Sequence, residues 1–210
     1  MDIFLFINII YLKLHSLIEM VIMSGKTEKP LEYIKSDLGR YIGQENTNFK
    51  NIIKFYIRSI SFRFSFWLRL CQSKNKIIKV IAILNHRRLS RKHMLDIPRN
   101  TKIGYGLYLG HGGSIVVNPT TVIGDNVNLS QFTTIGSNYG KAATIGNNVY
   151  IGPSVCIVED VVIGSESKIG AGSVVTKDVD SNSVYVGVPA KKVKVIEFND
   201  LVTRKYMGNK

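Results

Sequence analysis

Between Ile97 and Val175 an aliphatic side chain returns every six residues, and glycine often follows it. The series slips by two residues before Val117 and by four at about 139–143. A helix repeats every 3.6 residues and a half-buried strand alternates every two, so neither explains this period. The thirteen leading residues are Ile97, Ile103, Leu109, Val117, Ile123, Leu129, Ile135, Ile145, Ile151, Ile157, Ile163, Ile169 and Val175.

A six-residue period is typical of a three-sided coil in which each hexapeptide forms one short strand and one corner. The leading aliphatic side chains then point inward and stack about 4.8 Å apart along the axis. Steps such as Gly124-Asp125-Asn126 suit the corners, where the backbone turns sharply. A β-sandwich would space its strands by roughly 8–12 residues and does not fit. We therefore predict a mainly β fold of stacked hexapeptide coils.

Composition and charge narrow the class of protein. With 45% hydrophobic residues the chain is not disordered as a whole. Cys71 and Cys156 cannot form a disulfide scaffold and show no zinc-binding spacing. The net charge of +13 comes almost entirely from residues 51–102, which hold 13 basic residues and the single acid Asp96. No nucleic-acid-binding motif accompanies this charge, so we expect no nucleic-acid partner.

Residues 1–95 are predicted to be an N-terminal helical region, basic from residue 51 onward. Apolar residues at helical spacing line one face over 53–71, and Phe62, Phe66 and Leu70 line a second face. Such a helix needs a second partner, either a neighbouring subunit or a membrane surface. The apolar run Ile3–Leu12 is too short to span a bilayer. An amphipathic helix, a surface anchor and a start at Met20 or Met23 all stay open there, and we expect a cytoplasmic protein, with peripheral contact at the inner face of the membrane as one option.

Three motifs carry a family resemblance: Leu95-Asp96-Ile97-Pro98, Gly110-His111-Gly112-Gly113 and Gly187-Val188-Pro189-Ala190. With them the chain resembles the hexapeptide-repeat O-acetyltransferases, in the serine acetyltransferase-like branch that includes capsular and exopolysaccharide O-acetyltransferases. The resemblance implies a left-handed parallel β-helix over 96–190, followed by a basic, partly helical tail over 191–210. It also implies a homotrimer with active sites between subunits, acetyl-CoA as the acetyl donor and no metal.

The resemblance also implies roles for single residues. His111, the only histidine within the repeats, would be the general base, and Asp96, 15 residues earlier, would orient it. A structural histidine and a helix-to-coil cap are the alternatives for these two. Backbone groups near Gly152, Gly170 and Ala171 would line the pantetheine arm of the donor, while Lys191 and Lys192 would meet its phosphates unless they belong to a solvated tail. Cys156 is expected to be a packing residue, so we predict no acetyl-enzyme.

The acceptor follows from two departures from the serine acetyltransferase pattern. Gly110 stands where those enzymes carry an acid, and Lys141 lies in a shortened loop that lacks their Arg-His pair. Without these clamps for an amino acid, we expect a sugar hydroxyl, free or lipid-linked, in surface polysaccharide biosynthesis. Serine O-acetyltransferase of cysteine biosynthesis and a non-catalytic β-helix scaffold are the alternatives. A carbonic anhydrase of this coil type is excluded because it needs three histidine ligands.

Overall fold

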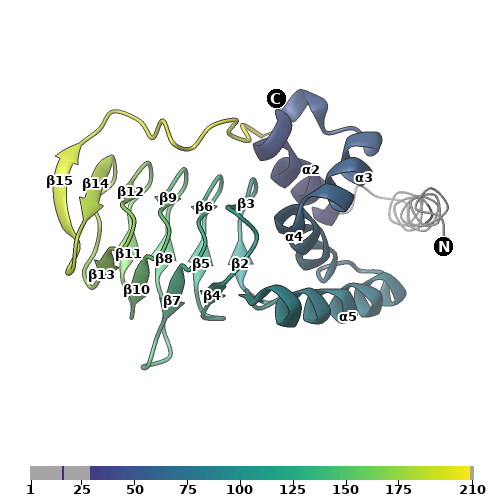
Figure 1. The fold of residues 1–210 in the computed structure, drawn as a ribbon, viewed down its shortest axis with the longest axis horizontal. Coiled ribbons are helices and arrows are strands. Elements are labelled where there is room, and N and C mark those ends of the chain that lie inside the picture. The colour runs from purple at the N-terminus through teal and green to yellow at the C-terminus, as the bar shows by residue number, and fades with distance from the viewer. Residues whose placement is uncertain (1–15, 17–28, 209–210) are drawn as a thin grey trace.

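The computed structural model describes residue 16 and residues 29–208, and it divides into a helical part and a coil of short strands (Figure 1). The predictions for the N-terminal segment before Lys29 lie outside the described residues, apart from Ser16. None of the helices in the described part is long and apolar enough to cross a membrane. The helices are α2 (Lys29–Ile42), the 3-10 turn η1 (Gln44–Asn46), α3 (Phe49–Arg58), α4 (Ile60–Leu70) and α5 (Lys76–His93).

The strands stack into three parallel sheets that form the sides of a prism, with one antiparallel strand at the end (Figure 1). Sheet A is β1 (Leu95–Asp96), β4 (Ile115–Val117), β7 (Thr134–Gly136), β10 (Cys156–Val158) and β13 (Val174–Val175). Sheet B is β2 (Lys102–Ile103), β5 (Val122–Ile123), β8 (Thr144–Ile145) and β11 (Val162–Ile163). Sheet C is β3 (Tyr108–Leu109), β6 (Asn128–Leu129), β9 (Tyr150–Ile151), β12 (Lys168–Ile169), β14 (Ser183–Val186) and β15 (Lys191–Val195).

The register explains the two breaks in the hexapeptide series. Thr144 pairs with Val162, the 18-residue step of three uninterrupted hexapeptides. Leu95 pairs with Ile115, a step of 20, because two extra residues enter the turn between β3 and β4. Val122 pairs with Thr144, a step of 22, because four extra residues enter the turn between β7 and β8. All thirteen leading aliphatic residues are buried, as predicted.

The glycine that follows many of these aliphatic residues has a steric reason. A Cβ on Gly124 would lie 2.7 Å from the carbonyl oxygen of Gly146 in the next coil. A Cβ on Gly164 would lie 2.3 Å from the backbone nitrogen of Ser181. Coils about 4.8 Å apart leave no room for a side chain at these steps.

The helical stretch predicted over 53–71 is two helices, α3 and α4, because Ser59 separates them. Ser59 is extended, and its hydroxyl accepts a hydrogen bond from the backbone N–H of Phe62 at 3.1 Å, which caps α4. The prediction that the second apolar face needs an outside partner is wrong for this helix. Phe62, Phe66 and Leu70 are all buried within the chain, in the same hydrophobic core as the other helices and the first coil.

A buried ion pair fixes α2 and α4 onto the first coil. The Asp37 carboxylate accepts from Nε and Nη2 of Arg69, both at 2.9 Å, and from the backbone N–H of Leu107 at 2.8 Å. Arg69 also donates to the carbonyl oxygens of Ile103 and Gly104 at 2.9 and 2.7 Å. Arg69 belongs to the basic segment 51–102, but its charge is buried and paired and is not part of the basic surface.

The C-terminal tail is extended, which corrects the expectation of a partly helical segment. After β15 the chain runs back along sheet C to the helices (Figure 1). The buried Asn199 donates to the carbonyl oxygens of Asn148 and Ser167 at 3.0 and 2.8 Å. Farther along, the Thr203 carbonyl accepts from Arg40, and Tyr206 stacks on Tyr105 at 4.9 Å. Polar groups of the tail form hydrogen bonds with the coil and with Arg40, which satisfies them without a helix.

Candidate functional site

His111 lies in the turn that joins sheet C to sheet A in the first coil, between β3 and β4. In this turn φ is 57° at His111, 66° at Gly112 and 47° at Ser114, whereas the same corner of the later coils has one residue of positive φ in each, at Phe132, Ser154 and Gly172. Glycine tolerates this region at no steric cost, which accounts for the glycine at position 112. The imidazole is exposed to solvent and makes no hydrogen bond with any residue that the structure describes.

The helices hold this turn in place. The backbone N–H groups of Ser114 and Ile115 donate to the carbonyl oxygens of His93 and Met94, at the end of α5. Gly112 is buried against the start of α4, where an added Cβ would lie 3.1 Å from the Ser61 hydroxyl. The helical part thus shapes the candidate site, a role that the repeat pattern does not reveal.

Asp96 lies in β1 of sheet A, directly one coil below Val116. It is exposed, at the same end of sheet A as the His111 turn but on the face of the prism and not at its edge. Within the described chain no hydrogen bond or ion pair joins Asp96 to His111. Its orienting role stays a prediction.

The residues that are predicted to line acetyl-CoA lie one above another along the edge of the prism that His111 occupies. Leu109 pairs with Leu129, Leu129 with Ile151 and Ile151 with Ile169, so Gly110, Ser130, Gly152 and Gly170 form one column. Three coil steps separate Gly110 from Gly170, which is roughly 14 Å. Gly152 is required by stacking itself, since its Cβ would lie 2.9 Å from the Ala171 nitrogen.

Free backbone donors lie beside this column. The N–H groups of Gln131 and Ala171 have no hydrogen-bond partner among the described residues. Such groups could bond the amides of a pantetheine arm or a developing oxyanion. Gln131 stacks one coil above His111, and its buried Oε1 also lacks a partner. Sequence reasoning missed Gln131, although counting 20 residues on from His111 would have found it.

Lys191 and Lys192 begin β15, at the far end of the prism from the helices (Figure 1). Both are exposed. Lys192 forms an ion pair with Asp180 at 2.9 Å, so part of its charge is already balanced. Lys191 has no such partner in the described part of the chain.

Lys141 lies in the enlarged turn between β7 and β8, where sheet A meets sheet B. Its ammonium group is 2.8 Å from the Asp160 carboxylate, and both side chains are exposed. Gly110 and Lys141, the two predicted acceptor residues, therefore lie at opposite edges of sheet A. One chain does not bring them together.

Of the two described histidines outside the coil, His86 has structural surroundings. His86 is buried against Phe64, and its Nε2 lies 3.0 Å from the carbonyl oxygen of Ile97. Burial lowers the pKa of His86 and favours the neutral imidazole. Among the described residues, no group of three or more His, Cys, Asp and Glu side chains is arranged to hold a metal ion.

Comparison with known proteins finds acetyltransferases among the proteins that this chain is similar to. Residues 142–177 match the family described as bacterial transferase hexapeptide (six repeats). Serine acetyltransferase 2 of Arabidopsis thaliana is 36% identical over 127 residues, which is 58% of this chain and 39% of that protein. Galactoside O-acetyltransferase of Escherichia coli (strain K12) is 39% identical over 115 residues, 48% of this chain and 57% of that protein.

The fold has a close counterpart among solved structures. The crystal structure of serine acetyltransferase from Brucella abortus strain S19 in complex with coenzyme A superposes with a TM-score of 0.66 and 23% identity, over 87% of this chain and 74% of that one. The prediction of a left-handed parallel β-helix with N-terminal helices is confirmed. The chain spans about two fifths of the Arabidopsis relative and just over half of the galactoside enzyme. Its similarity is to hexapeptide-repeat acetyltransferases, with serine and a galactoside as the acceptors that those relatives' names give.

Proposed function

We propose that this protein is an acetyl-CoA-dependent O-acetyltransferase that transfers the acetyl group directly to a hydroxyl. The observation that carries the proposal is the exposed, unpaired imidazole of His111 at the head of an edge with free backbone donors. His111 removes the proton from the acceptor hydroxyl while that oxygen attacks the thioester carbonyl. The carbon–sulfur bond then breaks, and the leaving coenzyme A sulfur takes up the proton from His111. Two relatives named as acetyltransferases and a structure of similar fold with coenzyme A support the donor.

The free N–H groups of Gln131 and Ala171 suit an acetyl-CoA molecule that lies extended along the His111 edge. Acetyl-CoA would supply the activated acyl carbon. The chain would supply the general base, the backbone hydrogen-bond donors and the cations. Lys191, at the far end of the same column, would meet phosphate as a point charge. Lys192 could do so only in competition with Asp180.

Serine is the acceptor that the comparisons support better. The relative with the longer match is a serine acetyltransferase, as is the similar solved structure. Neither these proteins nor the galactoside enzyme is named for a capsular polysaccharide. The expectation of polysaccharide biosynthesis thus has no support here, and the alternative, serine O-acetylation, becomes the first candidate.

A sugar hydroxyl is the second candidate, on specific observations. Gly110 offers no acid for an ammonium group, and the Lys141 charge is already matched by Asp160. Two exposed aromatic rings flank the edges of sheet A, Phe132 and Tyr139, with 59% and 90% of their surfaces accessible. An aromatic ring offers a flat apolar face to a sugar ring. The galactoside relative supports the same class.

The test is release of free thiol from acetyl-CoA with L-serine and with a galactoside as separate acceptors. Replacing His111 by Ala should lower kcat by about 10²–10⁴-fold on the better acceptor. Cys156→Ala should leave kcat within about twofold, because direct transfer needs no acetyl-enzyme. An unchanged kcat in His111→Ala, or turnover with neither acceptor, contradicts the proposal and favours the scaffold alternative. Asp96→Asn separates its two roles: an orienting residue lowers kcat, whereas a cap lowers only stability.

Acceptor specificity can be tested in the same assay. An added Cβ at Gly110 would lie 3.5 Å from Cα and 3.8 Å from Oγ of Ser130, so a larger side chain fits there. Gly110→Asp should raise kcat/KM for serine if an acid before the histidine is what serine recognition lacks. A loss of activity on serine, with unchanged stability, would contradict that reasoning.

We also propose that the active form is a homotrimer. The outer face of sheet A carries exposed Val116 and Val158, which a neighbouring subunit could cover. If three copies pack around an axis beside sheet A, the His111 edge of one copy meets the Lys141 edge of the next. Sedimentation equilibrium should then give three times the monomer mass of 23.5 kDa, and a monomer mass would contradict the proposal.

Cytoplasmic residence with peripheral membrane contact is a further proposal, and α5 is the element that supports it. Its exposed face is aliphatic in the first half, at Ile77, Val80 and Leu84, and basic in the second. The helix contains no acid, and each Lys or Arg near an anionic surface adds about 1 kcal/mol. Vesicles that contain phosphatidylserine should sediment the protein, whereas phosphatidylcholine vesicles should not. Leu84→Glu should abolish that binding.

A further inference from the structure

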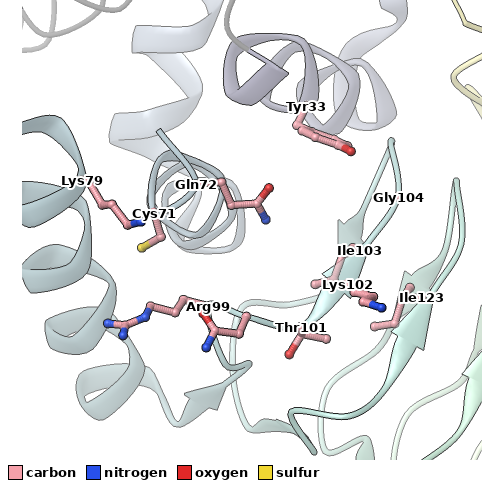
Figure 2. A pocket seen from close by; sticks show the side chains of 11 residues that line it. Tyr33, Cys71, Gln72, Lys79, Arg99, Thr101, Lys102, Ile103, Gly104 and Ile123 are labelled. Atoms are coloured by element: carbon pink, nitrogen blue, oxygen red, sulfur yellow. The ribbon is translucent and has the colours of Figure 1, made fainter. Parts of the chain in front are cut away.

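A cavity lies where the helices meet the first coil, away from the His111 edge. The cavity has a volume of about 650 Å³. Tyr33 of α2, Lys79 of α5, Arg99 and the start of β2 at Lys102 line it together with the α4–α5 connection (Figure 2). This volume lies in the range of small-molecule sites, roughly 300–1,000 Å³.

The charge of this cavity is positive and unbalanced. Lys79, Arg99 and Lys102 come from three separate elements, and no acidic residue is among those that line the cavity. None of the three cations forms an ion pair or hydrogen bond with a residue that the structure describes. In contrast, Lys141, Lys168, Lys192 and Lys205 each pair with a carboxylate.

Cys71, which lines the cavity, does not supply a negative charge that would balance the three cations. Figure 2 shows Cys71 between Lys79 and Arg99. Burial raises the pKa of the Cys71 thiol to about 11, so the thiol is neutral near pH 7. The nearby Arg69 is already matched by Asp37. An anion from solution would therefore enter a field of three cations with no competitor among the lining residues.

The position separates this cavity from the proposed acetyl-CoA path. Lys102 and Ile123 belong to sheet B, whereas the His111 edge joins sheets C and A. Lys191 and Lys192 are in the last strand, at the opposite end of the prism (Figure 1). A ligand here would not occupy the donor edge.

We propose that this cavity binds the phosphate group of a phosphorylated small molecule. A guanidinium and two ammonium groups line the cavity from different elements, with Lys79 and Arg99 beside Cys71 and Lys102 on the opposite side (Figure 2). Such cationic groups are common partners of phosphate oxygens. The Tyr33 ring also lines the cavity and gives the organic part of the ligand an apolar contact. Such a ligand bridges α5, the 98–101 segment and the first coil, and so stabilises the folded chain.

The test is calorimetric titration of the full chain with pyrophosphate and with glucose 6-phosphate. Glucose serves as the uncharged probe and citrate as the carboxylate probe. We expect saturable binding of at least one phosphate compound and a higher unfolding temperature in its presence. Arg99→Gln should weaken binding at least tenfold, about 1.4 kcal/mol. Arg87→Gln, which removes the same charge from the exposed face of α5, should change it by less than about twofold.

Each outcome decides the proposal. Tighter binding of glucose 6-phosphate than of pyrophosphate identifies a phosphate ester as the ligand, and the reverse order identifies a diphosphate or free phosphate. No binding of either compound up to about 10 mM, a range that includes weak sites, overturns the proposal. Equal loss in Arg87→Gln, or citrate binding as tight as phosphate binding, also overturns it. If Arg99→Gln does not fold, Lys102→Gln provides the same comparison.

Discussion

Replacing Asp37 by Asn removes one charge from the junction of helices and coil and keeps the shape of the side chain. Asp37 and Arg69 are 0% and 1% exposed, so solvent does not screen them. The change leaves the Arg69 guanidinium buried without its counter-charge. It also puts an amide group where the Leu107 N–H now finds a carboxylate oxygen at 2.8 Å.

The size of the effect follows from these contacts. Breaking a buried pair by removing one partner costs about 3–5 kcal/mol. For a chain of this size each kcal/mol lowers Tm by about 2–4 °C. A loss of about 4 kcal/mol should therefore lower Tm by roughly 8–16 °C. Because Leu107 leads into β3 and the His111 turn, acetyl transfer should fall as well.

Thermal unfolding followed by circular dichroism measures this loss, with Lys141→Gln as the matched control. The Lys141–Asp160 pair has the same kind of contact at 2.8 Å but is exposed, and its removal should cost less than about 1 kcal/mol. A double variant, Asp37→Leu with Arg69→Met, should lose less than Asp37→Asn, since no uncompensated charge is left. If Asp37→Asn is no less stable than Lys141→Gln, the assignment of this pair as the anchor of the helices is wrong.

Three further predictions concern the coil, the tail and pH. Gly164→Ala places a Cβ 2.3 Å from the Ser181 nitrogen and should cost about 1–3 kcal/mol in chemical denaturation, whereas Gly136→Ala, with nothing within 4 Å, should cost less than about 1. Asn199→Ala leaves the Asn148 and Ser167 carbonyls without their donor and should lose about 1–3 kcal/mol; an unchanged midpoint would mean that the tail adds no stability. Because the pKa of His86 is lowered in the folded chain, below about pH 6.5 the unfolded chain binds a proton that the folded chain resists, and stability should fall as pH drops. His86→Gln should make the stability depend less steeply on pH. An unchanged pH dependence would refute the assignment of His86 as a buried neutral histidine.

The coil could be predicted from the sequence because two features recur along it, the first in every hexapeptide and the second in most of them. An inward aliphatic residue fills the prism, as Ile145 and Ile163 do, and a following glycine lets the next coil stack closely. Both requirements recur at a fixed spacing, so the pattern is visible without coordinates. The register then follows by counting, including the two enlarged turns.

The junction of helices and coil could not be predicted, because its contacts occur once and join distant residues. Asp37 and Arg69 are 32 positions apart, and nothing in their surroundings marks them as partners. The tail is a similar case: Asn199 reaches Asn148, 51 positions away. Ser59 does carry a local signal, since serine is a favoured helix cap, but the apolar stripe across it concealed the break.

The candidate site was predictable in part. His111 was singled out because the Gly110-His111-Gly112-Gly113 element resembles the catalytic element of hexapeptide-repeat acetyltransferases, and the coil does expose it at an edge. The free donors of Gln131 and Ala171 could not be read from residue types, because backbone N–H groups look alike in a sequence. Neither could the Lys141–Asp160 pair, although its separation of 19 residues is close to one coil.

The two enlarged turns of the repeat contain His111, the candidate base, and Lys141, one of the residues predicted to bind the acceptor. Extra residues in a turn let the turn extend farther from the coil, and loops that extend from a rigid scaffold often carry binding residues. The chain adds two residues at His111 and four around Lys141, and nowhere else among the described coils is a turn lengthened. These turns lie at the two edges of sheet A, the face that also carries exposed Val116 and Val158. In the homotrimer proposed above, this face packs against a neighbouring copy and a site closes between its edges. Acceptor recognition would then require subunit association, so a monomeric variant should lose activity on the acceptor.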